Sequence, residues 1–192
     1  REDVPILIDQ EGGRVARLKP PHWRKYPPGR AYGTLSGNDP LVRREVTRLG
    51  ARLIAHDLHQ LGINVDCAPV LDVPEPGAHD IIGDRAYGES VDEVATLGRA
   101  AAEGLIAGGV LPVIKHIPGH GRAPADSHLQ LPVVDADWDE LSAHDFAPFR
   151  ALSDMPMAMT AHVIYSAIDA EQSATTSGTV FDKVIRGAIG FD

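Results

Sequence analysis

Four short apolar runs alternate along the chain with amphipathic segments of helical period. The runs are residues 4–8, 63–66, 110–114 and 155–159, and each is bounded by glycine, proline or charge. Runs of this kind are typical of buried parallel strands. The alternation limits the fold to the α/β class, because right-handed crossovers place such strands in one parallel sheet or barrel with helices outside it.

The first two helices have recognisable ends. Asp39 is an expected N-cap that precedes Pro40 at the first helical position, and Gly62 is expected to end this helix. Ser90 and Glu93 have the spacing of a capping box, and a glycine pair at 108–109 is expected to stop the second helix.

The other two helices are less regular. The third is predicted to begin near Asp137, with Glu140 placed to cap it, and to kink or break at Pro148. The fourth is expected over about residues 177–187. The predicted order is therefore β-α-β-α-β-α-β-α, which is about four βα units.

Length and charge narrow the functional classes. A chain of 192 residues predicts one domain. Its net charge of −9, without a basic run, argues against a nucleic-acid partner, and no apolar stretch is long enough to cross a membrane. Cys67 is the only cysteine and lies among apolar residues, which fits a reducing compartment.

The loop after the first run has charges suited to a ligand with several hydroxyl groups. Asp9, Glu11, Arg14 and Arg17 surround two glycines there. An alternative is a solvated turn in which Glu11 simply pairs with Arg14. After the second run, Arg85 lies on the loop before the capped helix, and by itself it is a weak indication of a ligand contact.

The loop after the third run carries the strongest chemical signal. Residues 115–128 contain three histidines, and Asp126 lies two residues before His128. In an extended segment those two side chains point the same way, so the carboxylate can orient the imidazole and raise its pKa. A histidine held in this way can donate a proton to a leaving group and then take one from water.

A metal site is the competing hypothesis for this loop. His116, His120 and His128 could bind zinc. Pro118 and Gly119 argue against it, because they prevent the helical geometry that usually brings histidines four residues apart onto one ion. A further histidine, His162, follows the fourth run and is either a ligand contact or a hydrogen-bond partner.

Three segments together resemble a known enzyme family. Residues 9–14 (Asp-Gln-Glu-Gly-Gly-Arg), 115–121 (Lys-His-Ile-Pro-Gly-His-Gly) and 126–128 (Asp-Ser-His) are similar to the bacterial β-N-acetylglucosaminidases of glycoside hydrolase family 3, the NagZ type. The resemblance covers essentially the whole chain. In that subgroup an Asp-His pair replaces the carboxylic acid that most glycosidases use as the acid/base catalyst.

The resemblance implies a (β/α)₈ barrel, of which this chain would be a part, and a retaining mechanism through a covalent glycosyl-enzyme. It implies removal of terminal β-linked GlcNAc, with fragments of GlcNAc-1,6-anhydroMurNAc from peptidoglycan recycling as substrates, by a cytoplasmic monomer without a cofactor. It makes His128 the acid/base catalyst and Asp126 its partner. The sugar contacts that it implies are Asp9, Arg17, Arg85, Lys115 and His116.

The resemblance also predicts that residues 1–192 are an internal piece of one catalytic domain of about 340 residues, without the first βα unit, the last units and the nucleophile. The alternatives are a related glycoside phosphorylase, a metal-dependent hydrolase that uses the histidine loop, and a piece that is inactive by itself. A neutral base repels phosphate less than a carboxylate does, which keeps the phosphorylase open.

Overall fold

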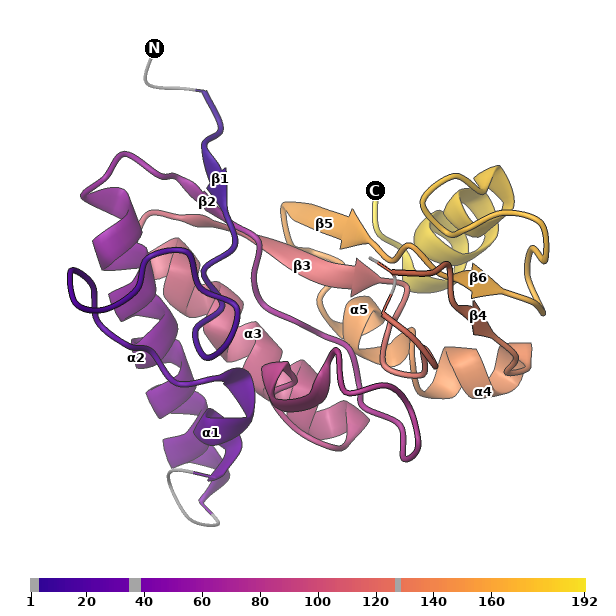
Figure 1. Cartoon of the computed structure of the whole chain (residues 1–192), viewed down its shortest axis with the longest axis horizontal. Helices are drawn as coiled ribbons and strands as arrows, with labels where there is room; N and C mark the ends of the chain where they lie inside the picture. Colours follow the sequence, from indigo (N-terminus) through magenta and orange to yellow (C-terminus); the bar gives the residue numbers. More distant parts are fainter. Residues whose placement is uncertain (1–3, 35–38, 127–128) are drawn as a thin grey trace.

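The computed structural model describes residues 4–34, 39–126 and 129–192 (Figure 1). Its main sheet has four parallel strands in the order β1-β2-β3-β5. These are β1 (Leu7–Ile8), β2 (Val65–Asp66), β3 (Leu111–Ile117) and β5 (Met157–Thr160). Each strand overlaps one of the four apolar runs, so the predicted α/β fold with four βα units is confirmed.

The first strand differs from its prediction. β1 has only two residues, and Leu7 is 54% exposed, so the expectation of a buried first strand is wrong. The reason is its position at the edge of the sheet, where β2 is its one neighbour in the sheet order. An edge strand is covered less than a central strand such as β3.

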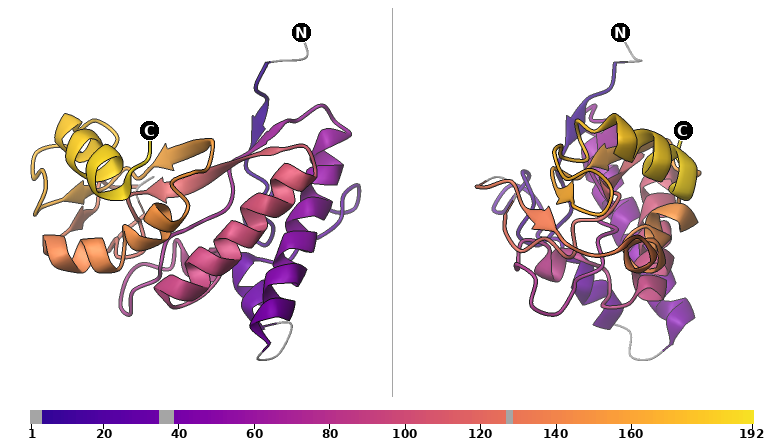
Figure 2. Two further views of the ribbon diagram at one scale, coloured as in Figure 1. Left: turned by 180° about the vertical axis from the view of Figure 1, so that it is seen from behind. Right: turned by 90° about the vertical axis from the view of Figure 1, so that its right-hand side faces the viewer.

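Two long helices pack side by side on one face of the sheet (Figure 2). They are α2 (Pro40–His59) and α3 (Val91–Ala107). A Cβ atom at Gly104 would lie 2.2 Å from the backbone oxygen of Arg48, so glycine is needed where the two helices approach closely.

The predicted starts of both helices are confirmed. Asp39 accepts a hydrogen bond from the N–H of Leu41 at 2.9 Å, and Ser90 accepts one from the N–H of Glu93 at 3.3 Å. The carboxylate of Glu93 accepts from the N–H of Glu89, one residue before the usual capping-box donor. The helix ends at His59 and Ala107 lie within three residues of the predicted stops.

The predicted break in the third helix is also confirmed. The segment forms α4 (Trp138–Ala143) and α5 (Ala147–Ala151), with Pro148 in the first turn of α5. A proline is tolerated there because a first-turn N–H has no partner within the helix. Asp137 caps α4 by accepting from the N–H of Glu140 at 2.9 Å.

The last predicted helix is a π-helix, η2 (Val180–Ile189), which ends at Gly190 with φ +78°. Four short elements were not expected from the sequence. α1 (Gly29–Thr34) and the 3₁₀ turn η1 (Gly83–Arg85) lie in loops, and β4 (Val133–Val134) pairs in parallel with β6 (Ile164–Tyr165) as a second small sheet.

The larger apolar core lies between the sheet and the C-terminal helices. It includes Ile114 of β3, Phe149 of α5 and Val184 of η2, all fully buried. None of the helices in the described ranges combines the length and apolar character that a membrane crossing requires.

Candidate functional site

A pocket of about 380 Å³ opens where the strands of the main sheet end. This volume lies in the usual range for small-molecule pockets, roughly 300–1,000 Å³. The loops after β1 and β2, the end of β3 and the end of β5 all contribute to its wall. The polar residues that line it are Asp9, Glu11, Arg14, Arg17, Arg85, Lys115, His116, His120, Thr160 and His162.

All five residues that were predicted to contact a sugar line this one pocket. Asp9 and Arg17 follow β1, Arg85 follows β2, and Lys115 and His116 lie on β3. Parallel strands bring their carboxyl ends to the same edge of a sheet, which explains how residues up to 107 positions apart meet there.

The pocket floor is built around Lys115. Its side chain is 2% exposed, and Nζ lies 2.6 Å from Oε1 of Glu11 and 3.2 Å from Oδ1 of Asp9. A buried ammonium is stable only when such partners compensate its lost hydration. Lys115 therefore holds the two acidic residues of the β1 loop in a fixed place.

Arg85 completes the arrangement around Glu11. Its Nε and one terminal nitrogen bind the two carboxylate oxygens at 2.9 and 2.8 Å. Burial opposes ionisation of Glu11, but Arg85 and Lys115 outweigh it and lower its pKa. The suggested Glu11–Arg14 pair is wrong, because Arg14 pairs instead with Asp80 and with Asp84 at 3.1 Å.

The rim of the pocket is shaped by Gln10, which the sequence did not indicate. Its side-chain oxygen accepts from the N–H groups of Arg17 and Leu18, and its amide donates to the carbonyl of Leu18. This folds the loop back so that Arg17 reaches Asp9 at 3.1 Å. Burial opposes ionisation of Asp9, but Lys115 and then Arg17 lower its pKa.

His116 is oriented by a buried carboxylate. Oδ2 of Asp72 lies 2.7 Å from Nδ1 of His116, and Oδ1 accepts from the backbone N–H groups of His116 and His120. Burial opposes ionisation of Asp72, but these histidines lower its pKa to about 2. Since Nδ1 faces Asp72, Nε2 is the ring nitrogen left for a ligand.

An irregularity in β3 allows neighbouring residues to line the same pocket. Consecutive side chains of a regular strand point to opposite faces. The register of β3 against β5 shifts between Lys115 and Ile117, and both Lys115 and His116 line the pocket. Such bulges often lie beside functional sites, where they redirect a side chain.

A second buried carboxylate lies close to the floor. Oδ1 of Asp66 accepts from the N–H of Gln10 at 3.0 Å, whereas Oδ2 has no hydrogen-bond partner among the described residues. Burial raises the pKa of Asp66 to about 7, and the charges of Glu11 and Asp9 contribute in the same direction. Asp66 therefore keeps its proton to a higher pH than an ordinary aspartate does.

His116 and His120 lie closer together than the sequence argument against a zinc site assumed. The rings of His116 and His120 lie with centroids 5.7 Å apart, because Asp72 binds both backbone N–H groups. Across the described ranges, no three His, Cys, Asp or Glu side chains are grouped as a metal ion requires. His162 also lines the pocket, and its Nδ1 lies 3.3 Å from Oγ of Ser173.

The predicted acid/base pair falls partly outside this description. His128 lies outside the described residues, so its predicted pairing with Asp126 stays a prediction. The backbone carbonyl of Asp126 accepts from the N–H groups of Leu129 and Gln130, at 3.0 and 3.1 Å.

Asp72, Gln10 and Asp66 have structural roles at the site that the sequence did not reveal. Asp66 and Asp72 are isolated polar residues among apolar ones, whereas Gln10 lies between Asp9 and Glu11. A polar residue in an apolar run must find a buried partner, and this signal could have identified the two aspartates but not Gln10.

The chain matches the N-terminal domain of glycosyl hydrolase family 3 over residues 1–192. A β-hexosaminidase of Methylococcus capsulatus is 41% identical over all of this chain and 56% of its own length. One from Bordetella parapertussis is 36% identical over all of this chain and 54% of its own. The chain thus spans about half the length of the curated relatives it matches.

Solved structures agree with this assignment. NagZ from Neisseria gonorrhoeae, in complex with N-trifluoroacetyl-D-glucosamine, has a TM-score of 0.90 and 35% identity over 97% of this chain and 55% of its own. A family 3 β-N-acetylglucosaminidase from Paenibacillus has a TM-score of 0.88 and 36% identity, over 98% of this chain and 35% of its own. The chain belongs to glycosyl hydrolase family 3, whose N-terminal domain it matches over its whole length.

Proposed function

We propose that the protein is a retaining exo-β-N-acetylglucosaminidase whose sugar-binding pocket lies at the carboxyl ends of the strands. The observation that carries this proposal is the convergence of Asp9, Lys115 and His116 on one pocket. Two kinds of relatives support the substrate class: the curated β-hexosaminidases, and the NagZ structure that holds N-trifluoroacetyl-D-glucosamine.

The proposed binding mode uses the pocket floor. Asp9 accepts hydrogen bonds from sugar hydroxyl groups, and Arg17, Lys115 and His116 donate to sugar oxygens. Arg85 contributes to sugar binding by fixing the Glu11 carboxylate, and any of its N–H groups that Glu11 leaves free can donate to a sugar oxygen. Because these groups are already paired with one another, the pocket is organised before the sugar arrives.

In the proposed chemical step, His128 donates a proton to the glycosidic oxygen as the bond to the sugar's anomeric carbon breaks and a carboxylate attacks that carbon. In the second step, His128 takes a proton from the water that displaces the carboxylate. Asp126 is proposed to orient the imidazole and stabilise its charged form. Such proton transfer contributes roughly 10²- to 10⁴-fold in rate.

The nucleophile is proposed to be none of the carboxylates described at the pocket. Asp9 and Glu11 both share Lys115, and Asp72 is occupied by His116. A carboxylate engaged in this way is a weak nucleophile, because attack would break its ion pair or hydrogen bonds. Asp66 is fully buried and does not line the pocket. We therefore place the nucleophile in another part of the domain, beyond residues 1–192.

The finer proposal is that the substrates are GlcNAc-1,6-anhydroMurNAc fragments of peptidoglycan, hydrolysed in the cytoplasm by a monomer. The basis is the resemblance to the NagZ type, together with the structural similarity to a NagZ. The test is to supply such peptidoglycan fragments and chitobiose together as competing substrates of the same enzyme, and we expect the fragments to be hydrolysed with the higher kcat/KM.

The test is turnover of methyl β-GlcNAc, whose leaving group needs a proton, by the protein at the full length that its gene encodes. We expect NMR to show that GlcNAc is released with retained configuration. In His128→Ala, kcat/KM should fall by about 10²-fold or more. Activity of His128→Ala within about threefold of the native protein would remove the acid/base assignment.

Two additions to this assay separate the alternative activities. GlcNAc 1-phosphate as the main product in phosphate buffer would indicate a phosphorylase. Loss of activity with a chelator, together with stoichiometric zinc by elemental analysis, would indicate a metal-dependent hydrolase. Residues 1–192 alone are expected to show no turnover, and measurable hydrolysis would contradict the proposed place of the nucleophile.

A further inference from the structure

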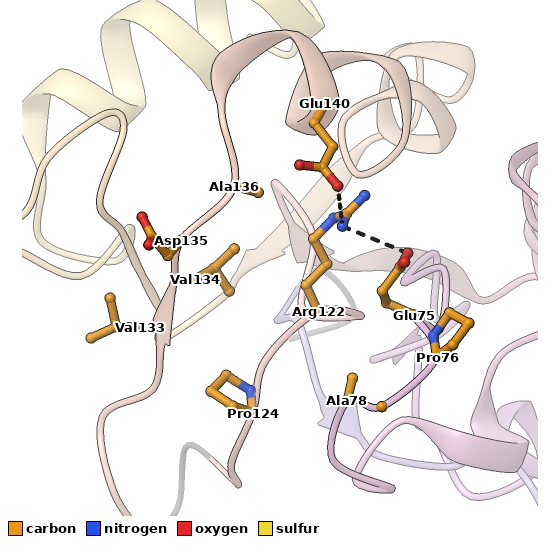
Figure 3. A pocket seen from close by; sticks show the side chains of 11 residues that line it. Glu75, Pro76, Ala78, Arg122, Pro124, Val133, Val134, Asp135, Ala136 and Glu140 are labelled. Carbon is orange, nitrogen blue, oxygen red and sulfur yellow. Dashed lines mark hydrogen bonds and ion pairs between the residues drawn. The ribbon is translucent and has the colours of Figure 1, made fainter.

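Arg122 lies at the centre of an ionic cluster outside the sugar pocket (Figure 3). Its Nε lies 2.6 Å from Oδ2 of Asp145, and one terminal nitrogen lies 2.7 Å from Glu140 and 3.6 Å from Glu75. The Arg122 side chain is 12% exposed and that of Asp145 is 2% exposed. We call these four residues the Arg122 cluster.

The Arg122 cluster joins three separate parts of the chain. Glu75 belongs to the loop after β2, Arg122 to the loop after β3, and Glu140 and Asp145 to α4 and the turn after it. Arg122 lies among three carboxylates, and His144 also lies 3.6 Å from Glu75 and 3.5 Å from Asp145. Replacing Arg122 would leave the buried carboxylate of Asp145 without this partner, which is costly in a water-poor environment.

The backbone beside Arg122 is fixed at several points. Tyr165 donates a hydrogen bond to the carbonyl of Gly119, and the N–H of Glu75 donates to the carbonyl of Gly121 at 3.3 Å. A Cβ atom at Gly121 would lie 1.8 Å from the carbonyl oxygen of Val73, so no other residue fits there. These contacts fix the chain as far as Arg122, four residues before Asp126.

Beyond Arg122 the support is weaker on one side. A hollow of about 310 Å³ lies between Arg122, Pro124 and the strand β4, with Pro76 on the opposite wall (Figure 3). Side chains that border an open hollow have fewer neighbours to pack against on that side. The N–H of His79 donates to the carbonyl of Ala123 at 3.1 Å, and the carbonyl of Asp126 accepts from the N–H groups of Leu129 and Gln130 before β4 begins.

We propose that Arg122 is a positioning residue that sets the direction in which the chain leaves β3 and so places the segment carrying Asp126. This inference rests on the proposed function, because it assigns Arg122 a role in proton transfer by Asp126 and His128. Arg122 itself does not line the sugar pocket, whereas its neighbour His120 does.

A positioning role and a purely stabilising role make different predictions. An enzyme that lacks a well-placed general acid still cleaves substrates whose leaving group departs without a proton, but it cleaves poor leaving groups slowly. Loss of a purely stabilising ion pair would instead lower the amount of folded enzyme. The apparent kcat/KM would then fall by the same factor on all substrates. The leaving-group dependence of kcat/KM therefore tells the two roles apart.

The experiment compares 2,4-dinitrophenyl and methyl β-GlcNAc as substrates of the full-length protein. For Arg122→Ala we expect kcat/KM on the methyl glycoside to fall about 10- to 100-fold, and on the dinitrophenyl glycoside to stay within about threefold. For Arg122→Lys we expect kcat/KM on the methyl glycoside to lie between the values of the native protein and Arg122→Ala, because an ammonium keeps the charge but cannot bind as a planar fork.

Two further variants serve as controls. Arg99 pairs with Asp154 at 2.6 Å and with the carbonyl of Ala151, between α3 and the end of α5. Arg99→Ala removes a more exposed ion pair on another part of the chain and should leave the ratio of kcat/KM on the two substrates unchanged. Arg122→Ala in the His128→Ala background should lower activity on the methyl glycoside no further, because both act on one step.

The outcomes are distinct. Equal losses of kcat/KM on both substrates in Arg122→Ala, or no loss on either, would overturn the positioning role. Native-like activity of His128→Ala would instead overturn the proposed acid/base catalyst. A normal loss in His128→Ala with an unchanged substrate ratio in Arg122→Ala would reject the positioning role alone.

Discussion

The pocket floor and the loop after β3 are held in place by different means. Around Lys115 the charged groups are buried or half-buried and paired at 2.6 to 3.2 Å. The loop that bears Asp126 depends on the Arg122 cluster and borders a hollow of about 310 Å³. Affinity and proton transfer should therefore respond to different substitutions.

Replacement of Lys115 should have the largest effect. Lys115→Met leaves Asp9 and Glu11 without their shared ammonium, and breaking a buried pair in this way costs about 3–5 kcal/mol. We expect the free energy of unfolding from urea titration to fall by about that amount, and GlcNAc binding to be lost.

Lys183→Met is the matched control, because Lys183 is exposed on η2. It should change the free energy of unfolding by less than about 0.5 kcal/mol. Equal effects of the two substitutions would mean that the floor is not held by its buried ion pairs.

Replacement of Asp72 should have an intermediate effect. Asp72→Asn replaces the carboxylate that fixes His116 through Nδ1 and both backbone N–H groups. A small displacement of His116 should lower kcat/KM about 100-fold. The loss should be similar for good and poor leaving groups, since His116 belongs to the floor; a selective loss on poor leaving groups would link Asp72 to the loop.

Replacement of Asp66 should change turnover least, by less than about threefold. Its effect should be on the pH dependence of stability. The pKa of Asp66 is about 7 in the folded protein and near 4 when unfolded, so the unfolded state loses its proton first as pH rises. The native protein should therefore lose stability relative to Asp66→Asn between about pH 4 and 7, as measured by urea unfolding; a constant difference over this range would contradict the raised pKa.

The sequence located the site better than it described the contacts within it. Asp9 and Lys115 could be placed in one pocket because each lies at or near the end of a predicted parallel strand. The pairing of Glu11 with Arg85 could not be predicted, because it joins loops 74 residues apart whose approach depends on the whole fold. Glu11 and Arg14, which are close in sequence, were the wrong pair for the same reason.

Local irregularities limited the rest of the prediction. The shift in β3 that allows Lys115 and His116 to line one pocket has no signature in a two-residue alternation. Asp72 lies among apolar residues and looks like part of the strand region until its histidine partner is known. The elements β4 and β6 have two residues each, too few for a hydrophobic period.

The central claim is that the pocket floor binds the sugar and the loop after β3 transfers the proton. The most direct test is the dissociation constant of GlcNAc, measured by calorimetry on the full-length protein. Asp9→Asn should weaken GlcNAc binding about tenfold or more, because it removes a charged acceptor from the floor. His128→Ala should bind GlcNAc within about threefold of the native protein while its kcat falls about 10²-fold or more. Equal loss of GlcNAc affinity in both variants, or native affinity in Asp9→Asn, would contradict this division.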